Sequence, residues 1–177
     1  MSTLPLMFVW LDKRVGHLPG GNEVMKTKFR KLLVPIRQFD RPTSCCDHID
    51  LCLKDKHVFF LTSNAFADDL FLKQVASIGH IHRIYIYDQE GIHFQSNDEN
   101  LNEKMGSKRI IQFDERLYEQ IVIDLVEIYC SESDRLGETR DAKDLLEIAL
   151  KLVKNIDDKD EHLQQLEKNL HSRLNHL

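Results

Sequence analysis

The sequence predicts an α/β domain built on a parallel sheet and followed by a helical extension. The main observation is the segment His57–Ser63, which is apolar from Val58 to Leu61 and too short to be a helix. A strand that is apolar on both faces is typical of the middle of a parallel sheet. The segment Leu6–Leu11, which ends at Asp12, has the same character. The third observation is that helical patterns lie between such segments along the chain.

The first half of the chain is predicted to alternate between strand and helix. Asn22 can cap a helix after the first strand, and Pro35 should end it. Residues 36–40 are a weaker strand candidate near an edge of the sheet. A short helix capped by Thr43 or Ser44 then leads to the central strand.

The second half continues this alternation. Ser63 or Asn64 can cap a helix over residues 65–78, whose apolar side is formed by Phe66, Leu70, Phe71, Val75 and Ile78. The β-branched and aromatic content of residues 81–88 indicates a strand. A polar stretch with a helical turn near Leu101 follows. Residues 109–114 are the last predicted strand, before a strongly periodic helix that begins near Leu117.

This order of elements predicts the topology of the sheet. Alternation of strands and helices implies parallel strands with helices on both faces, joined by right-handed crossovers. Five strands favour the flavodoxin-like order 2-1-3-4-5, with the segment His57–Ser63 in the centre. The α/β domain is expected to span residues 1–131, a polar linker residues 132–140, and the helical extension residues 141–177.

The extension is predicted to contain two amphipathic helices. Ala142–Ile156 carries apolar residues at helical spacing, and a charged turn separates it from a last helix. Leucines in this last helix form a heptad-like seam, with Leu163, Leu166, Leu170 and Leu174 as candidate association residues. The extension is therefore either a helical hairpin packed on the domain or the start of a longer helical region.

Composition limits the classes of function. The formal net charge of −5 argues against nucleic acid, because phosphate binding needs a clustered basic surface. No apolar run approaches the roughly 20 residues that span a bilayer, and the N-terminus lacks a signal-peptide pattern. The spacing of the four cysteines fits neither a disulfide framework nor a CxxC pair. We therefore expect reduced thiols, a cytoplasmic location and no membrane or nucleic-acid partner.

Polar residues at the carboxyl ends of the strands are the candidate ligand site. Asp12, Ser63, Asp88 and Asp114 follow four of the predicted strands, where ligands bind in folds of this class. Such acids could serve metal binding or phosphoryl transfer, but Asp and Ser at these junctions also cap the next helix. The cluster around Cys45 and His48 lacks the second pair of ligands that zinc needs. No catalytic residue, metal or cofactor is therefore predicted.

Two known families share part of this pattern. The architecture resembles phospho-receiver domains, but the third strand ends in Thr62-Ser63 where the acceptor Asp would stand. The segment after this strand resembles Toll/interleukin-1 receptor (TIR) domains, in which Ser-x-x-Phe-x-x-Ser-x-Trp-Cys-x-x-Glu leads into a helix. Ser63, Phe66 and the aromatic Phe71 match, whereas Asp69, Leu72 and Val75 replace the second Ser, the Cys and the Glu. Because this Glu is catalytic in NAD-cleaving members, the resemblance does not imply NAD hydrolysis here.

A third resemblance covers more of the chain. Leu6–Asp12, Phe59–Ser63 and Ile84–Asp88 look like an uncharacterised α/β module of some invertebrate multidomain proteins. In those proteins the module precedes ADP-ribosyltransferase or tetratricopeptide-repeat regions. The chain lacks the Arg…Ser-Thr-Ser…Glu-x-Glu residues of arginine ADP-ribosyltransferases, so that activity does not carry over.

Two hypotheses follow from these patterns. The first is a non-enzymatic, cytoplasmic signalling or protein-interaction module that binds a protein partner or itself through its C-terminal helices. The alternative is an NAD- or nucleotide-using enzyme, TIR-like or part of an ADP-ribosyltransferase protein, with its site at the carboxyl edge of the sheet. A third reading is a leading module that positions a further domain.

Overall fold

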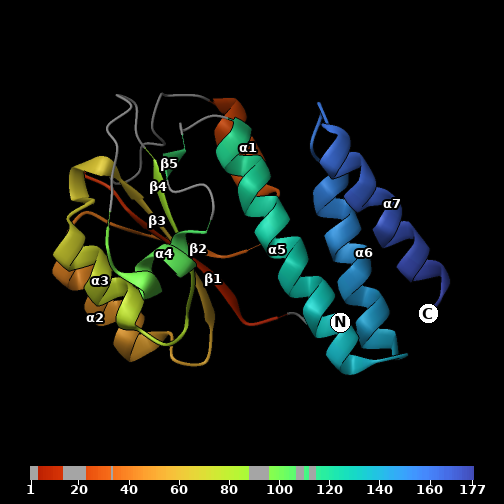
Figure 1. Cartoon of the computed structure of the whole chain (residues 1–177), viewed down its shortest axis with the longest axis horizontal. Helices are drawn as coiled ribbons and strands as arrows, with labels where there is room; N and C mark the ends of the chain where they lie inside the picture. Colours follow the sequence, from red (N-terminus) through yellow and green to blue (C-terminus); the bar gives the residue numbers. More distant parts are fainter. Residues whose placement is uncertain (1–3, 14–22, 33, 88–95, 107–109, 112–114) are drawn as a thin grey trace. The chain divides into compact units, whose positions relative to one another are not determined.

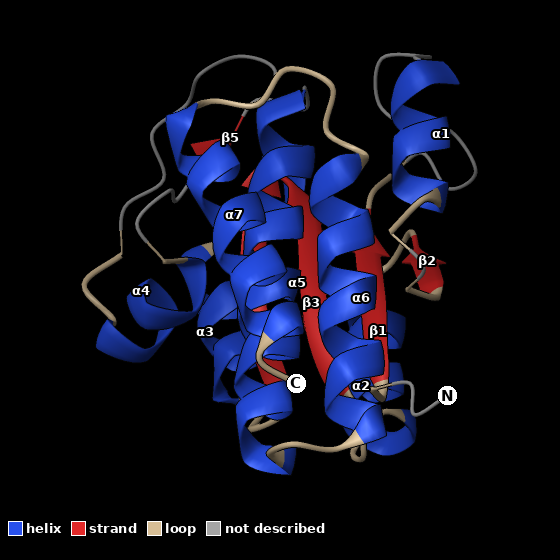
Figure 2. Cartoon of the chain, turned by 90° about the vertical axis from the view of Figure 1, so that its right-hand side faces the viewer, coloured by secondary structure: helices blue, strands red, loops and turns tan. Residues whose placement is uncertain are grey.

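The two most apolar segments of the chain form the centre of the sheet. β1 (Leu6–Leu11) and β3 (His57–Ser63) pair in parallel along their length, and Figure 2 shows them side by side. β2 (Ile36–Phe39) pairs with β1, and β4 (Ile81–Tyr87) pairs with β3, both again in parallel. The predicted α/β class, the parallel sheet and the strand order 2-1-3-4 are therefore confirmed.

The edge of the sheet beyond β4 differs from the prediction. β5 consists of Ile110–Ile111 alone, paired with Ile86 and Tyr87 of β4. The other residues of the predicted strand 109–114 lie outside the described part of the chain. Among the described residues, the sheet therefore has four full strands, and the predicted fifth is represented by two residues at its edge.

The computed structural model (Figure 1) describes residues 4–13, 23–32, 34–87, 96–106, 110–111 and 115–177. The chain divides into two units, which we describe separately. The sheet unit comprises Pro5–Lys26 and Leu33–Leu117, and the helical unit comprises Met1–Leu4, Thr27–Leu32 and Tyr118–Leu177. Two helices cross this division, α1 (Glu23–Arg30) and α5 (Glu115–Leu136).

The strands of the sheet unit carry different side chains on their two faces, because successive residues of a strand point to opposite sides. One face belongs to a hydrophobic core that includes Val9, Phe60 and Ile84. The other face carries an aromatic row, in which the rings of Phe8 and Phe59 stack with centroids 5.8 Å apart. Tyr85 stacks on Phe59 at 6.4 Å and continues the row across β4. The central strands are therefore buried on both faces, as their sequences predict.

Three helices complete this hydrophobic core: α2 (Pro42–Cys52), α3 (Asp69–Ser77) and α4 (Glu99–Met105). The predicted helix 65–78 begins later than expected, because Asp68 caps it by accepting a hydrogen bond from the N–H of Phe71 at 3.0 Å. Residues Asn64–Phe66 form a separate 3-10 turn.

The buried side of α3 also differs from the predicted one. Leu72, Val75 and Ala76 lie on the buried side, at helical spacing from one another. Leu70 lies two positions before Leu72, on the opposite side, and its relative exposure is 79%. The prediction that Leu70 belongs to the apolar side of this helix was therefore wrong.

The helical unit consists mainly of α5, α6 (Arg140–Lys154) and α7 (Glu161–Asn175). α5 continues to Leu136, so most of the predicted linker 132–140 is helix and only residues 137–139 separate α5 from α6. Ser133 donates a hydrogen bond to the carbonyl oxygen of Ala142 at 3.2 Å, which ties the two helices together at this turn. No helix in the described ranges combines the length and apolar character needed to cross a membrane.

The predicted leucine seam of α7 is partly used inside this unit. Leu163 and Leu170 are each only 1% exposed, whereas Leu166 and Leu174 are half-buried. α6 packs against α7, and its buried Ala149 favours a close approach of helices. A hairpin of α6 and α7 therefore forms, while association with another chain stays a prediction.

Candidate functional site: the carboxyl edge of the sheet

Three side chains are joined at the carboxyl edge of the central strands. Tyr87, the last residue of β4, donates its hydroxyl hydrogen to the carboxylate of Asp12 just after β1. Trp10 donates its indole N–H to the same Tyr87 oxygen at 3.3 Å, and the two rings meet edge to face at 6.2 Å. The Tyr87 hydroxyl is thus both donor and acceptor within a buried network.

Ser63 lies in the same row of residues. It pairs with Tyr87 in the ladder between β3 and β4, and it follows Thr62, which pairs with Leu11. The Ser63 hydroxyl oxygen is buried and has no hydrogen bond of ordinary geometry within the described part of the chain, but it is near enough to the Tyr87 hydroxyl to lower the pKa of Tyr87. Thr62 donates its hydroxyl to the carbonyl oxygen of Leu11 at 3.2 Å, so its polar group is satisfied within the sheet.

The environment of Tyr87 determines what its hydroxyl can do. Burial raises the pKa of Tyr87 well above its usual range, and the neighbouring Asp12 carboxylate raises this pKa further. The phenol therefore stays protonated at neutral pH, and it can donate a hydrogen bond but cannot act as a general base. In this arrangement its hydrogen is already engaged by Asp12.

The structure brings together only some of the predicted site residues. Asp12 and Ser63 lie in one row with Tyr87, whereas Asp88 and Asp114 lie outside the described residues. Sequence reasoning missed Trp10 and Tyr87, because both lie within predicted strands and were not considered as site residues. The available signal was their polar groups, since a buried Trp N–H or Tyr O–H usually needs a hydrogen-bond partner.

The cysteines provide no second site. Burial raises the pKa of both Cys45 and Cys46, so these thiols stay protonated and weakly nucleophilic. Cys52 is an exposed free thiol. Within the described segments, no group of three or more His, Cys, Asp or Glu side chains could hold a metal ion.

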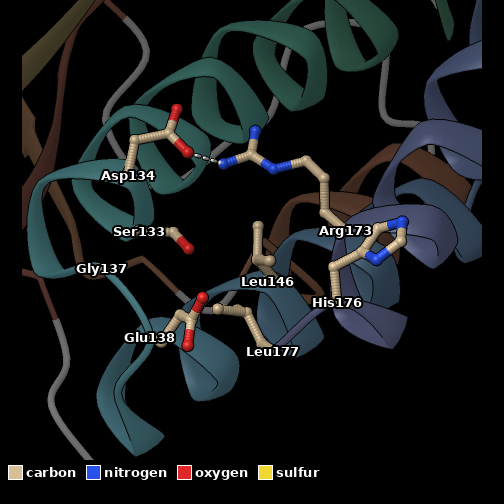
Figure 3. Close-up of a pocket in the computed structure, with 8 residues that line it drawn as sticks. All are labelled: Ser133, Asp134, Gly137, Glu138, Leu146, Arg173, His176 and Leu177. Atoms are coloured by element: carbon tan, nitrogen blue, oxygen red, sulfur yellow. Dashed lines mark hydrogen bonds and ion pairs between the residues drawn. The ribbon is translucent and has the colours of Figure 1, made fainter.

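The helical unit contains a pocket where the ends of α5, α6 and α7 meet (Figure 3). Its volume is about 330 Å³, and polar and apolar side chains both line it. Arg173 of α7 forms an ion pair with Asp134 of α5 and also donates to the carbonyl oxygen of Cys130 at 3.1 Å. These contacts fix the end of α7 against α5.

Comparison of the chain with protein-family models, with curated proteins and with solved structures found no match.

Proposed function

We propose that the chain is a non-enzymatic protein-interaction module whose partner binds the helical unit. The observation that supports this best is the network of Trp10, Tyr87 and Asp12 at the carboxyl edge. Catalytic side chains have to face a substrate, whereas these polar groups are engaged with one another, and Trp10 and Tyr87 are buried. The main role of the network is therefore to link the end of β1 to the end of β4.

The helical unit offers the features that an interaction needs. α7 leaves Leu166 and Leu174 half-buried at the margin of its packed side, and Leu177 is exposed. A pocket opens at the end of the same helix. Protein interfaces combine an apolar core with a polar rim, and this surface carries side chains of both kinds.

The proposal also includes a more specific fold class, a receiver-like or TIR-like domain. A receiver-like or TIR-like domain with a flavodoxin-like sheet would be expected to signal by contact when it lacks the family's catalytic residues. The strand order 2-1-3-4 and the two-residue β5 agree with such a sheet. A cytoplasmic location also belongs to the proposal, and the four cysteines are free thiols in agreement with it.

Sedimentation velocity of the full chain over a hundredfold range of concentration tests this proposal, with a second copy as the first partner. Leu166→Glu should weaken self-association at least threefold, because it places a charge at the apolar margin of α7. Leu51→Glu is the matched control, since Leu51 is an exposed leucine on α2. Circular dichroism must show that both variants are folded. A chain that stays monomeric, or equal weakening by both variants, contradicts the proposal.

An NAD- or nucleotide-using enzyme is the second candidate, and Ser63 favours it. Its hydroxyl group is buried beside Tyr87 without a hydrogen bond of ordinary geometry in the described residues, so it could bind a ligand at this edge. Nicotinamide release from NAD by the full chain tests this candidate directly. Turnover that disappears in Ser63→Ala and persists in Ser77→Ala, an exposed serine of α3, would establish the enzyme and overturn the first proposal.

A further inference from the structure

We propose that the pocket at the ends of α5, α6 and α7 binds the side chain of a lysine supplied by the partner protein. The inference rests on the proposed function and specifies the chemistry of the partner. The pocket has a volume of about 330 Å³, which accommodates a side chain with a four-carbon stem. In Figure 3 it is bounded by polar groups from α5 and α7, with Leu146 between them.

The charges around the pocket favour a cation. Asp134 and Glu138 supply two carboxylates, Arg173 supplies one guanidinium group, and His176 supplies an imidazole ring. Arg173 is already engaged by Asp134 and by the carbonyl oxygen of Cys130. Glu138 forms no hydrogen bond or ion pair within the described residues, so its carboxylate remains available. Two carboxylates against one guanidinium group leave these three side chains with a formal charge of −1, which attracts an ammonium group and repels an anion.

The apolar part of the lining suits the stem of a lysine. Leu146 of α6 is 1% exposed and contributes a buried apolar surface, and Leu177 lies beside it at the end of the chain. Lysine side chains bury their methylene groups against apolar surfaces while the ammonium group contacts polar partners. The combination of an aliphatic surface with an unpaired carboxylate therefore matches lysine better than a purely polar cation.

The backbone at the end of α5 holds Glu138 in place. Gly137 has a φ of +65°, the left-handed conformation that commonly ends a helix. Its N–H donates to the carbonyl oxygen of Ser133 at 3.1 Å. Ser133 in turn donates its hydroxyl to Ala142, so the turn that carries Glu138 is fixed at both ends. The carboxylate is therefore presented by an ordered turn.

A peptide titration of the full chain tests this inference. The probe is acetyl-Gly-Lys-Gly-amide, and the control peptide carries norleucine, which has the same stem without the ammonium group. We expect saturable amide shifts at Gly137 and Leu146 with the lysine peptide and none with the norleucine peptide. Glu138→Gln should weaken the binding at least threefold. Glu147→Gln, which removes the same charge from the exposed side of α6, should leave it unchanged.

Three results would overturn the inference: no saturable shifts at the pocket, equal binding of both peptides, or equal weakening by both variants. The probe is a peptide and not the partner, so this test is independent of the association test. A chain that binds the lysine peptide but stays monomeric contradicts the proposed function alone. A chain whose association depends on Leu166 but which does not bind the peptide contradicts the lysine pocket alone.

Discussion

The hydroxyl group of Tyr87 donates its hydrogen bond to the carboxylate of Asp12, which lies 75 positions earlier in the chain. This bond connects the end of β4 to the end of β1, two strands that are separated by β3 in the sheet. At the edge where a ligand site is predicted, the described side chains of Trp10, Tyr87 and Asp12 therefore form hydrogen bonds with one another.

Tyr87→Phe should lower the free energy of unfolding by about 1–2 kcal/mol, the usual cost of removing one partner from buried hydrogen bonds. The substitution takes an acceptor from Trp10 and a donor from Asp12 while it retains the ring. Urea unfolding followed by circular dichroism measures the change. Trp10 is the single tryptophan, so its fluorescence reports on the same site.

Tyr118→Phe is the matched control for this measurement. Tyr118 is also a buried tyrosine, but its hydroxyl has no hydrogen-bond partner within the described residues. Its removal should leave stability unchanged within about 0.5 kcal/mol or increase it slightly, because an unsatisfied buried hydroxyl is unfavourable. Equal losses in the two variants would show that the bonds at Tyr87 contribute nothing.

His82 should make the chain less stable in acid. Burial, together with the smaller effect of the charges of Arg83, His57 and Lys104, lowers the pKa of His82 to about 4. Between this value and the ordinary pKa of about 6.5, the unfolded chain binds more protons, so stability falls as the pH falls through this window. The full shift corresponds to about 3 kcal/mol, which solvent screening of the partly exposed ring reduces to about 1 kcal/mol.

Unfolding measured from pH 7 to pH 4 tests this contribution of His82. His82→Gln should flatten the pH dependence, because glutamine does not titrate. His162→Gln, at an exposed position of α7, should leave the dependence as it is in the unchanged chain. A His82→Gln variant that keeps the original pH dependence would contradict the assignment.

The thiols should react in a fixed order. Cys52 is exposed, whereas burial shields Cys45 and Cys46 and raises the pKa of each. A thiol-specific reagent at pH 8 should therefore modify Cys52 first and reach Cys45 only when the protein unfolds. Mass spectrometry of peptides at successive times gives the order. Early modification of Cys45 in the folded chain would contradict the packing of α2.

The ion pair of Arg173 and Asp134 should contribute modestly to stability. A double-mutant cycle with Arg173→Met and Asp134→Asn should give a coupling free energy of about 0.5–1 kcal/mol, in the range of exposed pairs. Added salt should reduce the coupling, because the Asp134 side chain is 72% exposed. A coupling that salt leaves unchanged would indicate that packing of the Arg173 stem, rather than charge, is what the cycle detects.

The strongest sequence signals correctly predicted the centre of the sheet. Leu6–Leu11 and Val58–Leu61 form the centre of a parallel sheet, because short apolar runs of this kind are typical of strands that are buried on both faces. The start of α3 was misplaced because Ser63 and Asp68 are both good caps, and the choice between them depends on packing. Residues 132–136 were not predicted to be helical, because they are mostly polar. Their contact with α6 is a hydrogen bond from the Ser133 side chain.

The candidate site was less predictable than the sheet. Topology alone places Asp12 and Ser63 at the same edge, because the ends of parallel strands meet there. The role of Tyr87 depends on register, which pairs it with Ser63, and on a hydrogen bond between residues far apart in sequence. Periodicity carries no information on such pairs. The pocket at the ends of three helices is likewise a product of packing.

The central position of β1 has a consequence for synthesis of the protein. Its six apolar residues leave the ribosome before β3, their partner on one side, which is complete only about 50 residues later. At about 5–20 residues per second, the nascent strand has no such partner for roughly 3 to 10 s. During this interval Leu6–Leu11 is an exposed apolar segment of the kind that chaperones bind. Growth conditions that slow translation should therefore reduce the yield of folded chain.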